Sequence, residues 1–423
     1  MTSLTDKLRA LGVHTGTQEI LKPNIRNQHS IDKVLDGTFI DTPYGEIFVV
    51  ENSFPIEYRL GQTPIKLTSE LDILSSWTGL CNIKLLPPEA FIFIDIETTG
   101  LSGGTGTYAF LIGIGQYIAN EFRIMQVFLR EPFEEPAQLF AVDQYLSNAQ
   151  AVVSFNGKAF DLPLLISRYT LHHRYHPFLN MAHIDLLHLA RRLWRDRIQN
   201  RMLSNLEYQI LGTSRTEEDI PGWMVPSIYF DFLRDSDARP LKRVFYHNLM
   251  DVLSLAALLN HISGMLSKSM RLSEIHKSDL IAIAGILEDI GDLESAIHLY
   301  NHALNPANHS YGFLDNHTFF KAIDRLARIH KHEQNYFIAI ELWKQAANLL
   351  QIPPCVELAK YYEHQQKDIS EAIYWTRFAL EILDKDIKPS ETDSFPTRFD
   401  RDLYRKDLEH RLERLSRKAL KNT

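Results

Sequence analysis

The sequence predicts a mixed α/β sheet flanked by helices, followed by an all-α domain of helical repeats. Segments with strand and helix patterns alternate between about residues 90 and 268. The first three strands follow one another through short connections, which is typical of an antiparallel meander. Strand patterns end near residue 275, where alanine-containing helical segments begin to recur. A chain of 423 residues is long enough to form two or three such units.

Residues 1–89 are expected to form a segment that flanks the α/β unit. Within it, GEIFVVENSF has the apolar alternation of a strand, with Ile47 and Val49 on one face. The segment contains no pattern that indicates chemistry.

Residues 90–268 are expected to form the α/β unit. Its first strands are AFIFIDIET, TYAFLIGIGQYI and EFRIMQVFL, and the short turn 119–121 predicts a hairpin between the last two. The other expected elements are a helix in PAQLFAVDQYL, a strand in AVVSFN, a helix from Asp161, a strand in MAHIDL, a helix in LLHLARRLWRDR and a long helix near VFYHNLMDVLSLAALLNHIS. A meander that passes into strand–helix alternation predicts a mixed sheet covered by helices.

Residues 275–384 are expected to form tetratricopeptide-like helical repeats. The segments SAIHLYNHAL, IAIELWKQAA and EAIYWTRFAL align, and their alanines Ala296, Ala339 and Ala372 stand 43 and 33 residues apart. The tetratricopeptide period is about 34 residues, so one interval matches it and the other requires an insertion. The alternative is a nonrepetitive helical bundle.

Residues 385–423 are expected to end the chain with a capping helix. Leu408, Leu412 and Leu415 fall on one face of such a helix and could cover the last repeat. Repeats of this kind bind protein partners or act as a rigid cap on a neighbouring domain, and the sequence leaves both roles open.

Composition narrows the function classes. The formal net charge of −8 disfavours a generally basic nucleic-acid coat protein, but it leaves room for a local basic groove. The cysteines Cys81 and Cys355 form no CxxC pattern, so we expect no disulfide framework and a cytoplasmic location. No run of about 18 apolar residues occurs, and therefore no membrane span is expected.

Two carboxylates end the first strand of the α/β unit. Because alternate residues of a strand share a face, Phe91, Phe93, Asp95 and Glu97 lie on one side, which turns acidic at its carboxyl end. Adjacent carboxylates repel one another, and a hard divalent cation such as Mg²⁺ or Mn²⁺ compensates them. The alternative is an exposed strand end with solvated acids.

Further acids follow at the ends of later elements. Asp161 stands where a helix begins, a position that also suits an acid near the helix dipole. Asp185 ends another strand, and we favour a structural role for it. His247 and Asp251 are four residues apart and share a helical face, although most such pairs are ordinary surface contacts.

Together these segments resemble the DEDD exonucleases of the ribonuclease-H-like superfamily. FIDIETTG is similar to the first exonuclease motif, FNGKAFD to the second, and the segment that ends at Asp251 to the third. The whole chain resembles, more narrowly, the YprB-type bacterial proteins, through ENSFPIEYRLG, LSNLEYQILGTSRTEEDIPG and HNLMDVLSL. The fold that this resemblance implies is a ribonuclease-H-like domain followed by tetratricopeptide-like repeats.

The resemblance implies a metal-dependent 3′–5′ exonuclease that hydrolyses single-stranded DNA or RNA. Two Mg²⁺ or Mn²⁺ ions would be held by Asp95, Glu97, Asp161 and Asp251. One ion would activate water and the other would stabilise the leaving oxygen. The alternative is a noncatalytic ribonuclease-H-like adaptor that recruits proteins through its repeats, although a scaffold gains little from four clustered acids.

The residue that serves the attacking water departs from the family pattern. DEDD enzymes place a His five residues, or a Tyr four residues, before the last Asp, whereas this sequence has Tyr246 and then His247. We expect His247 to be catalytic, because its pKa suits a base and its helical offset faces Asp251. Glu97 is also expected to have a catalytic role.

Several residues are expected to contact nucleic acid. GTGTYA has the spacing of a dinucleotide fingerprint, but the apolar FLIGIGQYI that follows predicts a strand where that fingerprint requires a helix. The glycines therefore indicate a connection that lets a substrate approach. The resemblance implies contacts from Leu101 and Asn156. Lys158, Arg191 and Arg195 are candidates for phosphate contacts, although the arginine run ARRLWRDRIQNR also fits a solvated helix face.

Overall fold

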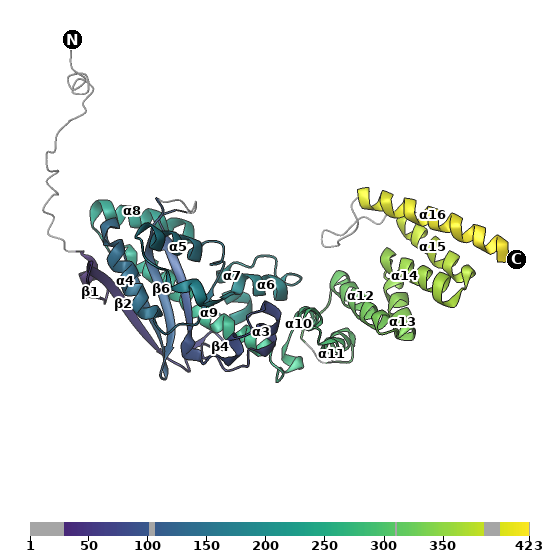
Figure 1. Ribbon diagram of the computed structural model, residues 1–423, viewed down its shortest axis with the longest axis horizontal. Helices are drawn as coiled ribbons and strands as arrows, with labels where there is room; N and C mark the ends of the chain where they lie inside the picture. Colours follow the sequence, from purple (N-terminus) through teal and green to yellow (C-terminus); the bar gives the residue numbers. More distant parts are fainter. Residues whose placement is uncertain (1–28, 101–105, 309–310, 385–397, 423) are drawn as a thin grey trace, which may run out of the picture.

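A seven-stranded mixed sheet forms the centre of the α/β unit (Figure 1). It is seen in a computed structural model that describes residues 29–100, 106–308, 311–384 and 398–422. The strands run β1 to β9 along the chain, at Thr38–Thr42, Gly45–Pro55, Arg59–Leu60, Thr63–Pro64, Phe91–Thr98, Ala109–Ile118, Glu121–Phe128, Ala151–Ser154 and Ala182–Asp185. The main sheet has the order β1-β2-β7-β6-β5-β8-β9, and β3 pairs with β4 alone.

The meander and the strand–helix alternation are both present. Strands β5, β6 and β7 pair antiparallel, and Ala119 has a positive φ of 54° in the tight turn between β6 and β7. Strand β8 then pairs parallel with β5, and β9 pairs parallel with β8. Strand β6 begins at Ala109, the last residue of GTGTYA, so the prediction of a strand at this place is confirmed.

The sheet begins earlier in the chain than residue 90. GEIFVVENSF is a strand, as predicted, but β2 pairs antiparallel with β7 from Phe48 to Pro55 and does not lie apart as a flanking segment. Strand β1 then forms the edge beyond it. Sequence pattern identifies a strand here, but it does not identify the partner strand, which lies about 75 residues further along the chain.

Helices cover both faces of the sheet. Those of the α/β unit, α2 to α9, lie at Ile31–Val34, Asp72–Thr78, Glu135–Leu146, Asp161–Leu171, Leu186–Trp194, Leu203–Leu206, Val225–Asp235 and Leu241–Met265. The two faces of β5 pack differently: Phe91 and Phe93 belong to the core beneath α6 and α9, whereas Ile92 and Ile94 pack with α4 and α5. The acidic end of β5 therefore faces α9.

The second half of the chain is helical. Helices α10 to α16 lie at Lys277–Asp289, Leu293–Leu304, Asn316–His332, Tyr336–Asn348, Ile352–Tyr361, Ile369–Asp384 and Arg398–Asn422. The aligned alanines Ala296, Ala339 and Ala372 are all buried, which lets neighbouring helices approach closely. Leu408 and Leu415 bury one face of α16. The tetratricopeptide-like identity of these helices and the proposed domain boundaries stay predictions.

The arginine run of α6 contributes to the junction between the two halves. Arg192 donates to Asp289 at 2.7 Å, and Arg197 forms a bidentate pair with Asp279 at 2.8 and 2.7 Å. Both acids belong to α10, the first helix of the helical region. Among the described residues, no helix is long and apolar enough to cross a membrane.

Candidate metal centre

Three elements bring the predicted acids to one edge of the sheet. Asp95 and Glu97 lie at the carboxyl end of β5, where the register with β6 shifts after Glu97. Asp161 is the first residue of α5. Gly157 packs against Ser154, because a Cβ at position 157 would lie 2.4 Å from Ser154 Oγ, and it would also lie 3.3 Å from Asp161 Oδ2. Asp251 projects from α9.

Glu97, His247 and Asp251 come together most closely. One ligand atom from each lies within 4.8 Å of the others, in an arrangement that could hold a metal ion. The Nε2 atom of His247 is 4.0 Å from Glu97 Oε1 and 3.5 Å from Asp251 Oδ2. Carboxylate oxygens are the ligands that Mg²⁺ and Mn²⁺ prefer, so the donor set fits a hard divalent cation.

The other two acids belong to the same electrostatic cluster. Burial raises the pKa of the Asp95 carboxyl well above its ordinary value, and repulsion from Asp251 and Glu97 raises it further. Burial likewise raises the pKa of Glu97, with repulsion from Asp251 and Asp161 as the next causes. Four carboxyl groups whose ionised forms disfavour one another make a site that attracts cations.

The stability of the metal-free protein should depend on pH through Asp161. Burial, followed by repulsion from Asp185 and Asp251, raises its pKa from 3.8 to about 7. Between these two pH values the carboxyl ionises in the unfolded chain but stays protonated in the folded one. The free energy of unfolding should therefore fall as pH rises through this window and level off above about pH 7.

The measurement compares Asp161→Asn with the wild type by chemical denaturation in EDTA at pH 5 and pH 8. One pKa unit corresponds to about 1.4 kcal/mol, and partial exposure of the side chain reduces the effect. Between pH 5 and pH 8, the free energy of unfolding of the wild type should fall by about 1–2 kcal/mol more than that of the variant. Equal losses in both proteins would contradict the prediction.

His247, and not Tyr246, faces the acids. Its Nδ1 lies 2.7 Å from Asp219 Oδ1. The hydroxyl of Tyr246 instead lies 3.4 Å from the backbone nitrogen of Thr216, which donates to it. The 2.7 Å contact of Nδ1 with Asp219, which accepts, is shorter than its 3.1 Å contact with the donor Nη1 of Arg215, so we place the ring proton on Nδ1. Nε2 is then an acceptor on the side of Glu97 and Asp251.

Arg215 is a member of the site that the sequence analysis missed. Its guanidinium pairs with Glu207 through Nε–Oε2 and Nη2–Oε1 contacts of 2.7 and 2.5 Å, and it also contacts Asp251. Its Nη1 atom lies 3.5 Å from Asp219 Oδ1 and 3.1 Å from His247 Nδ1. Arg215 and Asp219 occur in the segment LGTSRTEEDIPG, whose composition alone does not indicate that it reaches the acids.

Asp185 organises the loop after β8. Its carboxylate accepts hydrogen bonds from the backbone nitrogens of Asn156 at 2.8 Å, Lys158 at 3.1 Å and Leu187 at 3.0 Å. The last of these caps the start of α6. The first two bonds hold the loop that leads to Asp161, and the third fixes the start of α6, which suits the structural role favoured for Asp185.

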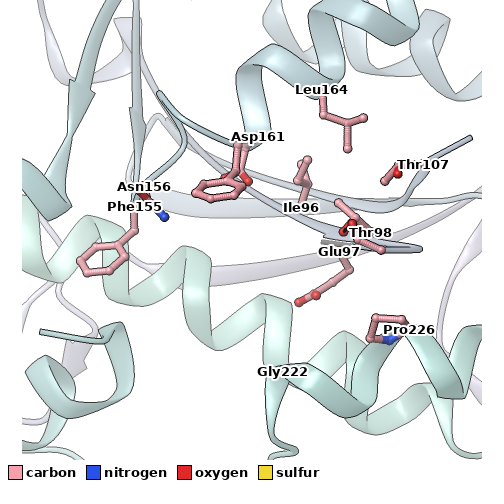
Figure 2. A pocket seen from close by; sticks show the side chains of 12 residues that line it. Ile96, Glu97, Thr98, Thr107, Phe155, Asn156, Asp161, Leu164, Gly222 and Pro226 are labelled. Carbon is pink, nitrogen blue, oxygen red and sulfur yellow. Dashed lines mark hydrogen bonds between the residues drawn. The ribbon is translucent and has the colours of Figure 1, made fainter. Parts of the chain in front are cut away.

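Two pockets adjoin the acids and share Phe155 and Asn156 in their linings. The first, of about 360 Å³, is mainly apolar and is lined by Ile96, Glu97, Thr98, Gly100, Thr107, Phe155, Asn156, Phe160, Asp161, Leu164, Gly222 and Pro226. In the view of Figure 2, Glu97 lies between Asp161 and Gly222. The second, of about 530 Å³, is lined by Asp95, Phe155, Asn156, Leu187, Arg191, Gln199, Asn200, Arg201, Met202, Leu203 and Asp251.

Only some of the residues predicted to contact nucleic acid line a pocket beside the acids. Asn156 lines both pockets and has a positive φ of 66°, and Arg191 lines the second pocket. Lys158 is exposed on the loop before α5. Arg195 is 69% exposed, its Nε lies 3.6 Å from Asp196 Oδ1, and it lines neither pocket. Leu101 lies outside the described residues.

Comparison with known proteins agrees with this architecture. The profile of the RNase_H superfamily matches residues 92–263. The chain is 31% identical over 334 residues to the "Uncharacterized protein YprB" of Bacillus subtilis (strain 168), and the match covers 76% of this chain and 78% of that protein.

A solved structure of the family B DNA polymerase from Pyrobaculum calidifontis is similar at 16% identity and a TM-score of 0.32. That match covers 57% of this chain and 30% of the polymerase chain. The sheet order, the acids at its edge and the extent of the sequence match lead to one assignment. The chain belongs to the YprB family, with a ribonuclease-H-like domain followed by a helical region.

Proposed function

We propose that this protein is a metal-dependent 3′–5′ exonuclease that hydrolyses the phosphodiester bonds of single-stranded nucleic acid. The observation that carries the proposal is the meeting of Glu97, His247 and Asp251 within 4.8 Å. Glu97 lines the apolar pocket, and Asp251 lines the second pocket together with Arg191 and Arg201. Membership of the RNase_H superfamily supports it. The 3′ direction rests on the resemblance to DEDD exonucleases.

The four acids are the proposed metal ligands. Asp95, Glu97, Asp161 and Asp251 would hold two Mg²⁺ or Mn²⁺ ions, and their mutual repulsion favours such binding. When bound, these ions would supply an activated water and stabilise the charge of the phosphate and the leaving oxygen. The chain itself contributes the orientation of the ligands and the exclusion of bulk water.

The two pockets suggest a path for the strand. The apolar pocket suits the terminal nucleoside, and the aromatic side chain of Phe160, which is 55% exposed, lines it. Trp223, which is 77% exposed, follows the lining residue Gly222 in the chain. Aromatic side chains stack on unpaired bases without regard to their sequence. Arg191 and Arg201 in the second pocket suit the phosphates further along the strand.

His247 is the proposed base. With its Nδ1 proton donated to Asp219, its Nε2 accepts the proton of the attacking water. Water attacks phosphorus, the bond from phosphorus to the 3′-oxygen breaks, and the shortened strand keeps a 3′-hydroxyl. The released nucleotide then carries a 5′-phosphate.

Labelled oligonucleotides test this function. The purified protein is incubated with single-stranded DNA or RNA carrying a label at the 5′ or the 3′ end, with Mn²⁺ or with EDTA. We expect a ladder of shortened 5′-labelled strands, immediate release of the 3′ label, slower attack on a blunt duplex and no reaction in EDTA.

A circular single strand serves as the control, because an exonuclease needs an end. Cleavage of the circle at the linear rate would indicate an endonuclease. Inactivity on every substrate with Mn²⁺ would contradict the proposal and would favour the adaptor role of a ribonuclease-H-like domain.

A further inference from the structure

A row of three residues crosses the sheet beside the acids. Asp95 on β5 lies directly opposite Gly113 on β6, and Gly113 lies opposite Gln126 on β7. The side chain of Asn248, from α9, occupies the space above the glycine. A Cβ at position 113 would lie 2.3 Å from Asn248 Oδ1, so glycine is required for this close approach.

The Asn248 amide bridges the two ends of this row. Its Nδ2 donates to Asp95 Oδ2 at 2.8 Å and to the Asp95 carbonyl at 3.1 Å. Its Oδ1 accepts from Gln126 Nε2 at 2.9 Å, and the same Nε2 donates to the carbonyl of Phe245 at 2.8 Å. Each of the two amide nitrogens therefore uses both of its protons.

This network fixes the orientation of both amides. Asn248 is fully buried and Gln126 is 1% exposed, so water does not compete for their hydrogen bonds. A flipped Asn248 amide would turn its oxygen toward two oxygens of Asp95 and its nitrogen toward the nitrogen of Gln126. Both contacts would be repulsive, and the observed orientation is therefore the stable one.

We propose that Asn248, oriented by Gln126 across Gly113, is a positioning residue that holds the Asp95 carboxylate in the rotamer that binds the metal. The inference rests on the proposed function, because it assigns a metal to Asp95. By bonding Oδ2, Asn248 leaves Oδ1 as the oxygen available to a cation.

Mn²⁺ affinity of the full chain, measured by calorimetry without nucleic acid, tests the proposal. Outer hydrogen-bond partners of metal ligands typically contribute 10- to 100-fold in affinity. We expect the Kd for Mn²⁺ to rise about 10-fold or more in Asn248→Ala. Gln126→Met should weaken binding less, because Asn248 would keep its bonds to Asp95.

Asn260 provides the matched control. It lies on the same helix, is also buried, and bonds to Thr68 and Pro64 instead of to an acid. Asn260→Ala should lower the unfolding midpoint yet leave the Mn²⁺ affinity within about twofold of the wild type. A merely structural role for Asn248 predicts the same behaviour in Asn248→Ala.

Gly113→Ala provides a second variant, because its methyl group collides with the Asn248 amide. Combining it with Asn248→Ala should relieve the collision and restore stability without restoring Mn²⁺ affinity. Suppose that the wild type binds Mn²⁺. An unchanged Kd in Asn248→Ala, or recovery of Mn²⁺ affinity in the double variant, would then overturn the positioning role. A wild type that binds no Mn²⁺ at millimolar concentration would overturn the metal site itself, and with it this inference.

Discussion

Replacing both Asp95 and Glu97 by alanine is expected to lower the Mn²⁺-dependent rate of strand shortening by at least about 10³-fold. Both residues end the same strand and face α9, where Asp251 and His247 lie. Their loss removes two of the four proposed ligands. The variant should remain folded, since removing buried, mutually repelling carboxyl groups relieves electrostatic cost.

The matched control is Asp41→Ala/Glu46→Ala. These exposed acids pair across β1 and β2 at the far edge of the same sheet. The control should keep the wild-type rate, and unfolding midpoints establish that both variants are folded. If the Asp95/Glu97 variant retained activity, the measured nuclease would be a contaminant and the assignment of the site would be wrong.

His247→Ala is expected to lower kcat by about 10²- to 10⁴-fold, with a much smaller change in KM. The histidine acts on the attacking water in the proposed mechanism, so its loss should affect the chemical step more than substrate binding. Single-turnover measurements with a labelled strand separate these quantities. Mn²⁺ must be saturating, because His247 lies 3.5 Å from the proposed ligand Asp251.

Tyr246→Phe is the comparison for this prediction. It removes a hydroxyl that lies near the backbone of Thr216 and not among the acids, so near-normal turnover is expected. The two candidates adjoin in sequence, but helix geometry turns successive side chains by about 100°. Near-normal turnover in His247→Ala together with loss of activity in Tyr246→Phe would show that the base has been assigned wrongly.

Periodicity was sufficient to predict most of the α/β unit. The alternation of Phe91, Phe93, Asp95 and Glu97 placed both acids on one face of a strand, and the structure confirms that face and its opposite. The turn at Ala119 predicted the hairpin, and the apolar run after GTGTYA predicted a strand in place of a phosphate-binding helix. Such local patterns depend on neighbouring residues, which the sequence shows directly.

Long-range pairing was not predictable in the same way. The strand in GEIFVVENSF was predicted, but its pairing with β7 was not, because the alternation of residues in a strand does not identify its partner strand. The arginine run was another case: Arg191 lines a pocket beside the acids, whereas Arg192 binds Asp289 in the helical region. Consecutive arginines on one helix point in different directions, and the tertiary packing determines which part of the protein each of them contacts.

The sequence by itself determined the α/β order, the helical second half and the acids that end β5 and begin α5. These follow from residue periodicity and from motifs within short segments. Only the tertiary structure decided that Arg215 and Asp219 reach the site, and that Asn248 bridges Gln126 to Asp95 above Gly113. Their bonds join segments that are far apart in the chain. No local sequence pattern therefore indicates these contacts, which form only when the chain folds.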